Sequence, residues 1–240
     1  MIRKLLRGLA LGAVLILLVG CTLQEHAKSM MENHEHTQTI PENQAALQDI
    51  PNSLKMAILD VEDVRFYEHG GLDLYGIGRA VYNDVTTRSA AEGASTLTQQ
   101  LARSVYLSQD RTMTRKLNEI VLAFELEHNY SKDDILTMYL NNVYFGNGAT
   151  GIRAAADTYF GKGQDLKKLT LAESALLAGL PNAPSALNPW IPENVPNAIE
   201  RRNHVLDAMY KNGDITQDQL TQAKNEPLKL FGQGEGSDTP

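Results

Sequence analysis

Two adjacent carboxylates, Glu62 and Asp63, stand where an apolar helical pattern over residues 54–61 runs out. A carboxylate near a helix C-terminus is electrostatically disfavoured, because the aligned peptide dipoles place negative partial charge there. Carboxylates accept protons in general base catalysis, although an acidic residue at a helix end is more often simply solvated. The pair is therefore a candidate for proton transfer only if further residues support it.

A second polar stretch runs from Gly93 to Arg103 and is predicted to open a helix. Glycine and hydroxyl residues at a helix start favour contacts with anions or sugars, because backbone N–H groups are free there. Ser95 is the expected helix cap. The alternative is an ordinary cap followed by a polar helix face. The side chains that could contact a ligand are Ser95, Thr96, Gln99 and Gln100.

A third stretch places Arg111, Arg115 and Glu119 at successive steps of four residues, which puts them on one stripe of a helix. The guanidinium fork of arginine suits phosphate oxygens. The alternative is a surface pair of Arg115 with Glu119, worth at most ~0.5 kcal/mol. The apolar side of this amphipathic helix is expected opposite the stripe, at Leu117, Ile120, Val121 and Phe124.

The elements that must position these residues are helices, with almost no strand alternation between them. Capping boxes mark several helix starts, at Ser131 with Asp134, Thr170 with Glu173 and Thr216 with Gln219. Gly213 is expected to end the helix that begins near Pro196. The pattern predicts a nearly all-α fold in one compact domain over residues 51–231.

The composition limits the possible functions. A chain of 240 residues allows one sizeable domain with terminal extras. The formal net charge of -7 argues against a general nucleic-acid binder, which needs a basic surface. The single cysteine, Cys21, allows neither an internal disulfide nor a cysteine-based metal site.

The N-terminus has the layout of a secretory signal peptide. An apolar stretch over residues 9–19 is shorter than the ~20 residues that a spanning helix needs. Small residues then lead into Cys21, and residues 18–21 resemble the bacterial lipoprotein box, in which the cysteine is acylated and becomes the new N-terminus. The basic residues that precede the apolar stretch are Arg3, Lys4 and Arg7.

We therefore expect a lipoprotein signal peptide at 1–20, a lipid-anchored tether at 21–50 and a disordered tail at 232–240. The alternative is an uncleaved signal anchor. Either arrangement places the rest of the chain outside the cell, on the outer face of the cytoplasmic membrane.

Six motifs follow one another in a fixed order along the chain. They are Glu-Asp-x-x-Phe-x-x-His-x-Gly-x-Asp at 62–73, Gly-x-Ser-Thr-Leu-Thr-Gln-Gln at 93–100, Arg-Lys-x-x-Glu at 115–119, Tyr-Leu-Asn-Asn-Val-Tyr-Phe-Gly at 139–146, Tyr-Phe-Gly-Lys at 159–162 and Ala-Glu-Ser-Ala-Leu-Leu-Ala-Gly-Leu-Pro at 172–181. Over roughly residues 50–212, this series resembles the family 51 peptidoglycan glycosyltransferases, a domain found alone or at the front of bifunctional penicillin-binding proteins.

The resemblance implies a mainly α, lysozyme-like fold with a small, mobile, membrane-facing lobe that includes the stretch around 75–93. It implies that a growing glycan on polyprenyl pyrophosphate is the donor and that lipid II is the acceptor. The acceptor 4-hydroxyl attacks with inversion, which gives a β-1,4 bond. Further partners would be the membrane and cell-wall synthesis proteins. No tightly bound cofactor is implied, and the one candidate is a divalent cation, Mg²⁺ or Mn²⁺, that accompanies the pyrophosphate.

The resemblance also assigns roles to individual residues. Glu62 matches the general base, and Glu119 would orient a cationic cluster or help to hold the divalent cation. The cations that would stabilise the departing pyrophosphate are Arg103, Arg111, Arg115, Lys116 and Lys132, with Arg111 favoured for forked contacts. Lys132 could equally be a solvated residue. The remaining substrate-binding candidates are Ser95, Thr96, Gln99, Gln100 and Asn141.

Two other functions are compatible with parts of the sequence. A lysozyme-like lytic enzyme would share the carboxylates and helices but would not need the stripe of arginines. A catalytically silent precursor-binding lipoprotein would not need both Glu62 and Glu119. Within the 240 residues there is no Ser-x-x-Lys and no Lys-Thr-Gly, the sequences typical of penicillin-binding transpeptidases, so we expect a monofunctional glycosyltransferase.

Overall fold

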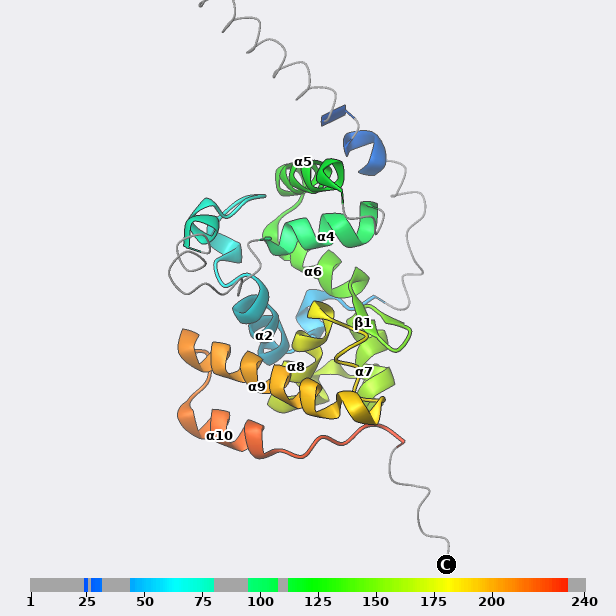
Figure 1. Ribbon diagram of the computed structural model, residues 1–240, viewed down its shortest axis with the longest axis vertical. Coiled ribbons are helices and arrows are strands. Elements are labelled where there is room, and N and C mark those ends of the chain that lie inside the picture. Colours follow the sequence, from blue (N-terminus) through cyan, green and yellow to red (C-terminus); the bar gives the residue numbers. More distant parts are fainter. Residues whose placement is uncertain (1–23, 26, 32–43, 80–94, 108–111, 233–240) are drawn as a thin grey trace, which may run out of the picture.

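The computed structural model describes residues 24–25, 27–31, 44–79, 95–107 and 112–232. Helices dominate this part of the chain, so the predicted mainly α fold is confirmed (Figure 1). The α-helices include α2 (Asn52–Glu62), α4 (Leu97–Tyr106), α5 (Met113–Asn129), α6 (Lys132–Asn142), α7 (Ile152–Phe160), α8 (Leu171–Gly179), α9 (Val195–Asn212) and α10 (Gln217–Asn225). Short 3-10 helices lie at Leu47–Asp49, Phe66–Glu68, Leu166–Lys168, Leu180–Asn182 and Pro192–Asn194.

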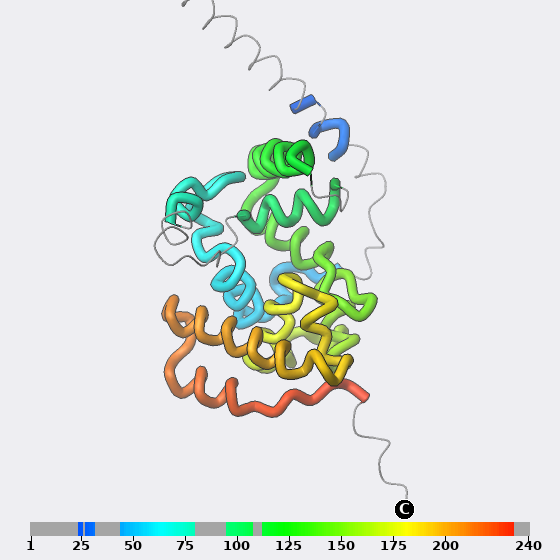
Figure 2. Tube along the Cα trace, viewed as in Figure 1, coloured from blue at the N-terminus to red at the C-terminus, as the bar shows by residue number. Residues whose placement is uncertain are grey.

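The helices form two packed groups, and α2 lies between them (Figure 2). In one group, α4 packs against α5 and α6. In the other, α8 packs against α9, and α10 lies against α9. Because α2 packs against α8 and α9 while its C-terminal end meets α4, the last residue of α2 lies where the two groups meet.

The helix starts follow the predicted capping boxes. Ser131, Thr170 and Thr216 each accept a hydrogen bond from the third backbone N–H of their helix, and the side chain at that position bonds back to the cap. Gly213 ends α9 in the left-handed conformation with φ 87°, as predicted. Ser95 is not the cap of α4, however: Thr96 is, because Gln99 stands three residues after it and completes a capping box.

Helix α5 buries a different face from the one that was predicted. Its buried residues are Glu119, Leu122, Ala123, Glu125 and Leu126. Leu117 and Phe124, expected to face the core, are 53% and 51% exposed. The Glu119 side faces inward together with the apolar residues Leu122, Ala123 and Leu126, and the helix leaves a second apolar face on the surface.

One hairpin interrupts the helices among the described residues and was not predicted. Strands β1 (Tyr144–Gly146) and β2 (Ala149–Thr150) pair antiparallel. Asn147 and Gly148 make the turn with positive φ values of 49° and 76°, which asparagine and glycine adopt most readily. A pattern of two or three residues per strand is too short for alternation to be recognised.

Some residues before position 51, the expected start of the domain, are also buried. Ala45 and Ile50 are buried, and part of the expected tether, residues 27–31, is helical with Ala27 and Met31 buried. A mostly polar segment can bury a few small or flexible apolar residues although its sequence shows no sustained apolar periodicity. Within the described residues, no helix is both long and apolar enough to cross a membrane. The expected signal peptide, Cys21 and most of the expected lobe lie outside the described residues.

Candidate active site

Glu62 is the last residue of α2, and its side chain is only 10% exposed. Its two carboxylate oxygens are held from different helices. Gln100 of α4 donates from Nε2 to Oε2 at 2.9 Å, and Arg201 of α9 donates from Nη2 to Oε1 at 3.1 Å. Each oxygen keeps a further acceptor position, so the carboxylate is fixed in place and can still accept a hydrogen bond from a ligand.

The surroundings of Glu62 raise its pKa. Burial is the largest cause, since it disfavours the charged carboxylate, and it is opposed by the hydrogen bond from Gln100 and by the positive charges of Arg201 and Arg103. Burial, together with the negative charge of Glu62, also raises the pKa of Tyr139, whose hydroxyl lies 3.5 Å from Gln100 Oε1. A carboxylate with a raised pKa is a stronger base than a solvated one, which suits proton abstraction near neutral pH.

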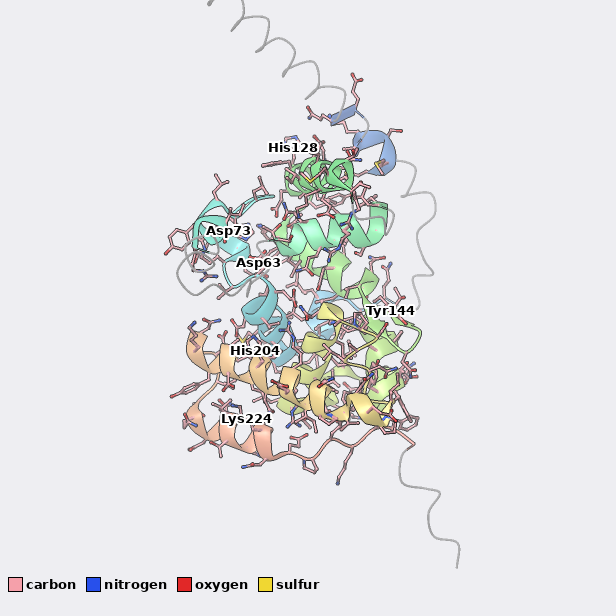
Figure 3. All side chains as sticks on the ribbon, viewed as in Figure 1. Asp63, Asp73, His128, Tyr144, His204 and Lys224 are labelled. Carbon is pink, nitrogen blue, oxygen red and sulfur yellow. The ribbon has the colours of Figure 1, made fainter. Side chains whose placement is uncertain are left out.

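Asp63 has a structural role beside Glu62. It is the C-cap of α2, and its side chain is 4% exposed. Its Oδ2 accepts the backbone N–H of Leu97 at 2.9 Å, and its Oδ1 lies 2.7 Å from His69 Nε2. Asp63 therefore joins the end of α2 to the start of α4, close to the loop that carries Asp73 (Figure 3). This contact explains why a second carboxylate follows Glu62.

Glu119 is the centre of a second polar group. Its side chain is 1% exposed, and its Oε2 accepts from Lys116 Nζ at 2.9 Å. The guanidinium of Arg115 lies 3.5 Å from Oε1, which has no hydrogen-bond partner among the described residues. Lys116 also donates to Ser95 Oγ at 2.9 Å. The structure thus brings together four predicted residues, which we call the Glu119 cluster: Ser95, Arg115, Lys116 and Glu119.

The start of α4 connects the two groups. Gln100, in the first turn of α4, contacts Glu62, while Ser95, two residues before the helix begins, contacts Lys116. Arg103 follows on the same helix, and its charge acts on Glu62. A ligand that contacts both Glu62 and the Glu119 cluster would therefore lie along the first turn of α4.

Other predicted residues serve the fold. Thr96 and Gln99 are buried and bond each other's backbone in the capping box, and Thr96 Oγ1 also donates to the carbonyl of Gly71 at 3.1 Å. Asn141 holds the chain before α2, because its amide donates to the carbonyl of Ala45 and accepts the N–H of the same residue. Among the described residues, no hydrogen bond joins these three side chains to Glu62 or Glu119.

Lys132 belongs to a separate ion pair. Its Nζ lies 2.8 Å from Glu127 Oε1 and 4.3 Å from the centre of the Phe66 ring. Thr98 donates to the same Glu127 oxygen at 2.5 Å. The structure therefore gives Lys132 its own partners, apart from the Glu119 cluster. Arg111, the favoured phosphate ligand, lies outside the described residues.

Arg201 is the site residue that the sequence did not reveal. It lies in α9, 139 residues after Glu62, and outside all six motifs. The sequence around Arg201 is that of an ordinary amphipathic helix, so it does not distinguish Arg201 from a surface arginine. Only the packing of α9 against α2 and α8 brings its guanidinium to Glu62.

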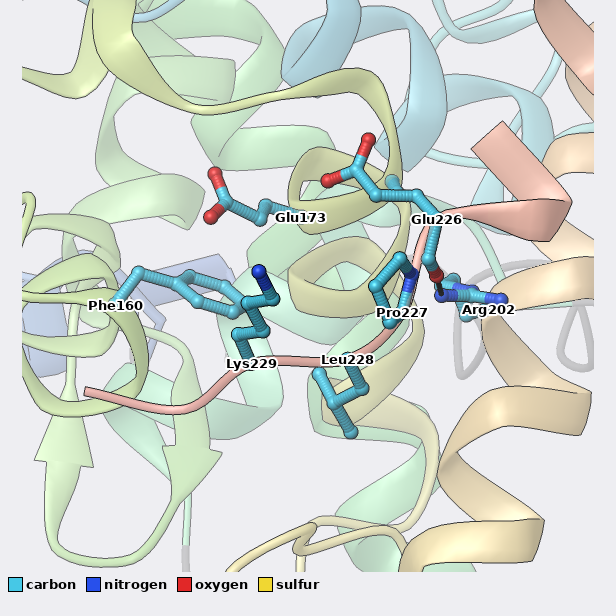
Figure 4. Close-up of a pocket in the computed structure, with 8 residues that line it drawn as sticks. Phe160, Glu173, Arg202, Glu226, Pro227, Leu228 and Lys229 are labelled. Carbon is cyan, nitrogen blue, oxygen red and sulfur yellow. Dashed lines mark hydrogen bonds between the residues drawn. The ribbon is translucent and has the colours of Figure 1, made fainter. Parts of the chain in front are cut away.

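A cavity of about 170 Å³ lies elsewhere, between α8 and the segment that follows α10 (Figure 4). It is lined by Phe160, Glu173, Arg202 and Glu226, among others. Three of its charged side chains are engaged with the protein: Glu173 binds Lys162 at 2.6 Å, Arg202 donates to the carbonyl of Glu226 at 2.8 Å, and the Glu226 carboxylate accepts from Thr170 at 2.7 Å. It contains none of the predicted site residues.

The donor set of the site does not suit a resident divalent cation. The described residues include no group of three or more His, Cys, Asp or Glu side chains that could hold a metal ion. The carboxylate of Glu119 already lies between Lys116 and Arg115, and a cation placed there would be repelled by both. That a divalent cation arrives with the substrate, bound to its pyrophosphate oxygens, stays a prediction.

Comparison with known proteins places the chain in a family. A family model described as Transglycosylase matches residues 28–210. Penicillin-binding protein 1A of Neisseria lactamica is 47% identical over 180 residues, which cover 75% of this chain and 22% of that protein. Penicillin-binding protein 1F of Bacillus subtilis is 42% identical over 195 residues, which cover 81% of this chain and 27% of that protein. This chain thus spans about a quarter of the length of these relatives.

Among solved structures, the crystal structure of penicillin-binding protein 1A from Haemophilus influenzae matches with a TM-score of 0.46 and 25% sequence identity. The match covers 81% of this chain and 18% of that one. The family model covers most of the chain and includes Glu62, the Glu119 cluster and Arg201. The chain belongs to the transglycosylase family.

Proposed function

We propose that this protein is a peptidoglycan glycosyltransferase of bacterial cell wall biosynthesis. It would polymerise lipid II into β-1,4-linked glycan strands, with inversion at the donor sugar and release of polyprenyl pyrophosphate. The observation that carries the proposal is the placement of a fixed, mostly buried carboxylate, Glu62, and a cationic group around Glu119 along one helix start. Membership of the transglycosylase family supports it.

In the proposed reaction, Glu62 is the general base. The 4-hydroxyl oxygen of the acceptor forms a bond to the anomeric carbon of the donor, the bond from that carbon to pyrophosphate breaks, and the hydroxyl proton passes to Glu62. Positioned bases of this kind contribute ~10²–10⁴ in rate. Gln100 and Arg201 hold the carboxylate in a fixed orientation, so little reorganisation is needed when the proton moves.

The Glu119 cluster would bind the leaving group. Pyrophosphate departs as a stable anion, so it needs positive charge more than it needs a general acid. Lys116 and Arg115 supply that charge, and Glu119 fixes their positions. Arg103 contributes from the next turn of α4 and Arg111 from outside the described residues. A divalent cation, Mg²⁺ or Mn²⁺, would enter with the pyrophosphate.

We also propose that the protein works at the membrane surface. Exposed apolar side chains on and near α5 favour contact with lipid, which carries both substrates. They include Leu74, Tyr75, Met113, Leu117 and Phe124, which are 51% to 82% exposed. Cell-wall synthesis proteins are further proposed partners. The absence of Ser-x-x-Lys and Lys-Thr-Gly within the 240 residues supports the proposal that this chain carries no transpeptidase site.

The anchor is a separate prediction. We expect Cys21 to be acylated after removal of residues 1–20, because the apolar stretch and the small residues before Cys21 match a lipoprotein signal. Two or more acyl chains anchor a protein stably in the membrane, since each CH₂ group buried in lipid contributes about 0.8 kcal/mol. Mass spectrometry of the native N-terminus measures this directly. An intact Met1 would support the uncleaved signal anchor.

Incubation with two substrates tests the proposed function. The purified protein should convert lipid-linked disaccharide into glycan polymer, and it should leave finished cell wall intact. Cleavage of finished wall without polymer formation would show a lytic enzyme. Binding of the precursor with neither reaction would show a catalytically silent protein.

A further inference from the structure

The C-terminal end of α8 lies against the arginine that pairs with Glu62. Gly179 is the last residue of α8 and is buried. Its backbone is right-handed helical, with φ -78° and ψ -26°, which every residue adopts readily. The backbone conformation therefore does not require glycine at this position, and the reason for it must lie in the surroundings.

The surroundings leave no room for a side chain. A Cβ atom at position 179 would lie 2.8 Å from Cγ of Arg201, closer than real Cβ atoms approach another heavy atom. The other nearby atoms, Cγ2 of Val205 at 3.6 Å and Cβ of Arg201 at 3.7 Å, would be in ordinary contact. The conflict is therefore with the stem of Arg201 alone.

The stem of Arg201 leads to Glu62. Cγ is close to the backbone, so moving it moves the whole guanidinium group. That group donates to Glu62 Oε1 at 3.1 Å through Nη2, and its Nε donates to the carbonyl of Gly179 at 3.4 Å. The arginine side chain is 19% exposed, so its packed neighbours leave room for few other side-chain conformations.

We propose that Gly179 is a positioning residue for Glu62 and that it acts through Arg201. Its missing side chain lets the arginine stem cross the end of α8 and bring the guanidinium to the carboxylate. Gly179 touches no reacting atom. The inference rests on the proposed function, in which Glu62 is the general base.

The consequence is a change in how activity depends on pH. Loss of the Arg201 contact removes a positive charge that opposes the burial of Glu62, so the pKa of Glu62 rises further. The base acts only when deprotonated, so the acid limb of the pH profile moves to higher pH. The groups that face Glu62 are Arg201 from α9, Arg103 and the neutral Gln100 from α4, and Tyr139 from α6.

Asp60 must be controlled in this measurement because it is a second carboxyl group on α2. Burial and the neighbouring Asp214 raise the pKa of Asp60 to about 7. Titration of Asp60 could therefore be mistaken for titration of Glu62. Carrying out the experiment with and without Asp60→Asn separates the two groups.

The test is a double-mutant cycle of Gly179→Ala and Arg201→Ala, read by polymerisation rate against pH and by melting temperature. Each single variant should move the acid limb to higher pH, with its rate recovering towards wild type as pH rises. Arg201→Ala removes the Cγ atom and hence the conflict. Gly179→Ala should then cause no further shift, and it should raise the melting temperature, because alanine is favoured over glycine in a helix.

Three results would overturn the proposal. One is a Gly179→Ala variant with the wild-type pH profile. Another is a rate that falls equally at all pH values, which would indicate a purely structural role. The last is additivity of the two substitutions in both measurements. If the wild-type protein forms no polymer, the proposed function fails instead, and the melting temperatures still show whether positions 179 and 201 are coupled.

Discussion

Glu62→Gln is expected to lower polymerisation turnover by at least ~10²-fold and to leave the affinity for a donor mimic nearly unchanged. Glutamine keeps the size of the side chain, and its one carbonyl oxygen can still accept a hydrogen bond from Arg201 or Gln100. It cannot accept the proton of the acceptor hydroxyl. The lost interaction belongs to the transition state, so substrate binding is spared. Single-turnover polymerisation rates and binding of a phosphoglycolipid donor mimic measure the two quantities.

Glu68→Gln is the matched control for this substitution. Glu68 allows the same chemical change six residues later, on a side chain that is 69% exposed and makes a long ion pair with Arg65 at 3.9 Å. It should polymerise at the wild-type rate. A Glu62→Gln protein with near-normal turnover would show that the base is misassigned.

Glu119→Gln is expected to lower both turnover and donor-mimic affinity. The carboxylate fixes Lys116 at 2.9 Å and Arg115 at 3.5 Å, so its loss leaves the two cations without a common anchor. Lys116→Ala should weaken binding of the donor mimic by about 10–100-fold. This factor corresponds to the loss of one hydrogen bond to a charged group, which is worth roughly 1.5–3 kcal/mol. Isothermal titration with the donor mimic measures both affinities.

Glu125→Gln is the control on the same helix. Glu125 is also buried in α5, but among the described residues no hydrogen bond or ion pair joins it to the Glu119 cluster. Its substitution should leave donor-mimic affinity unchanged, whatever it does to the melting temperature. Equal loss of affinity in both variants would mean that any buried charge on α5 matters, and the specific role of Glu119 would be wrong.

Local signals predicted the helices well. The capping boxes at Ser131, Thr170 and Thr216 form as expected, because a hydroxyl residue followed three positions later by an acid or amide satisfies two backbone N–H groups at once. The left-handed stop at Gly213 follows from the freedom of glycine at positive φ. These features depend on a few neighbouring residues, and the sequence contains all of them.

Orientation and long-range contacts were not predictable from the same patterns. Apolar periodicity alone placed the Phe124 side of α5 in the core, whereas the structure buries Glu119 and leaves Phe124 exposed. Both faces of α5 carry apolar residues at helical spacing, Leu122 and Leu126 on one and Leu117 and Phe124 on the other, so periodicity alone does not choose between them. Arg201 reaches Glu62 only through the packing of α9, and the roles of Thr96, Gln99 and Asn141 in the fold depend on contacts that spacing does not reveal.

The most direct test of the roles proposed for Glu62 and the Glu119 cluster measures polymerisation rate and donor-mimic affinity side by side for Glu62→Gln, Glu119→Gln and Lys116→Ala. Glu62→Gln is expected to lose rate and keep affinity, while Glu119→Gln and Lys116→Ala are expected to lose both. Loss of donor binding in Glu62→Gln together with normal binding in Glu119→Gln would contradict these roles, because the base and the phosphate-binding group would then have exchanged places.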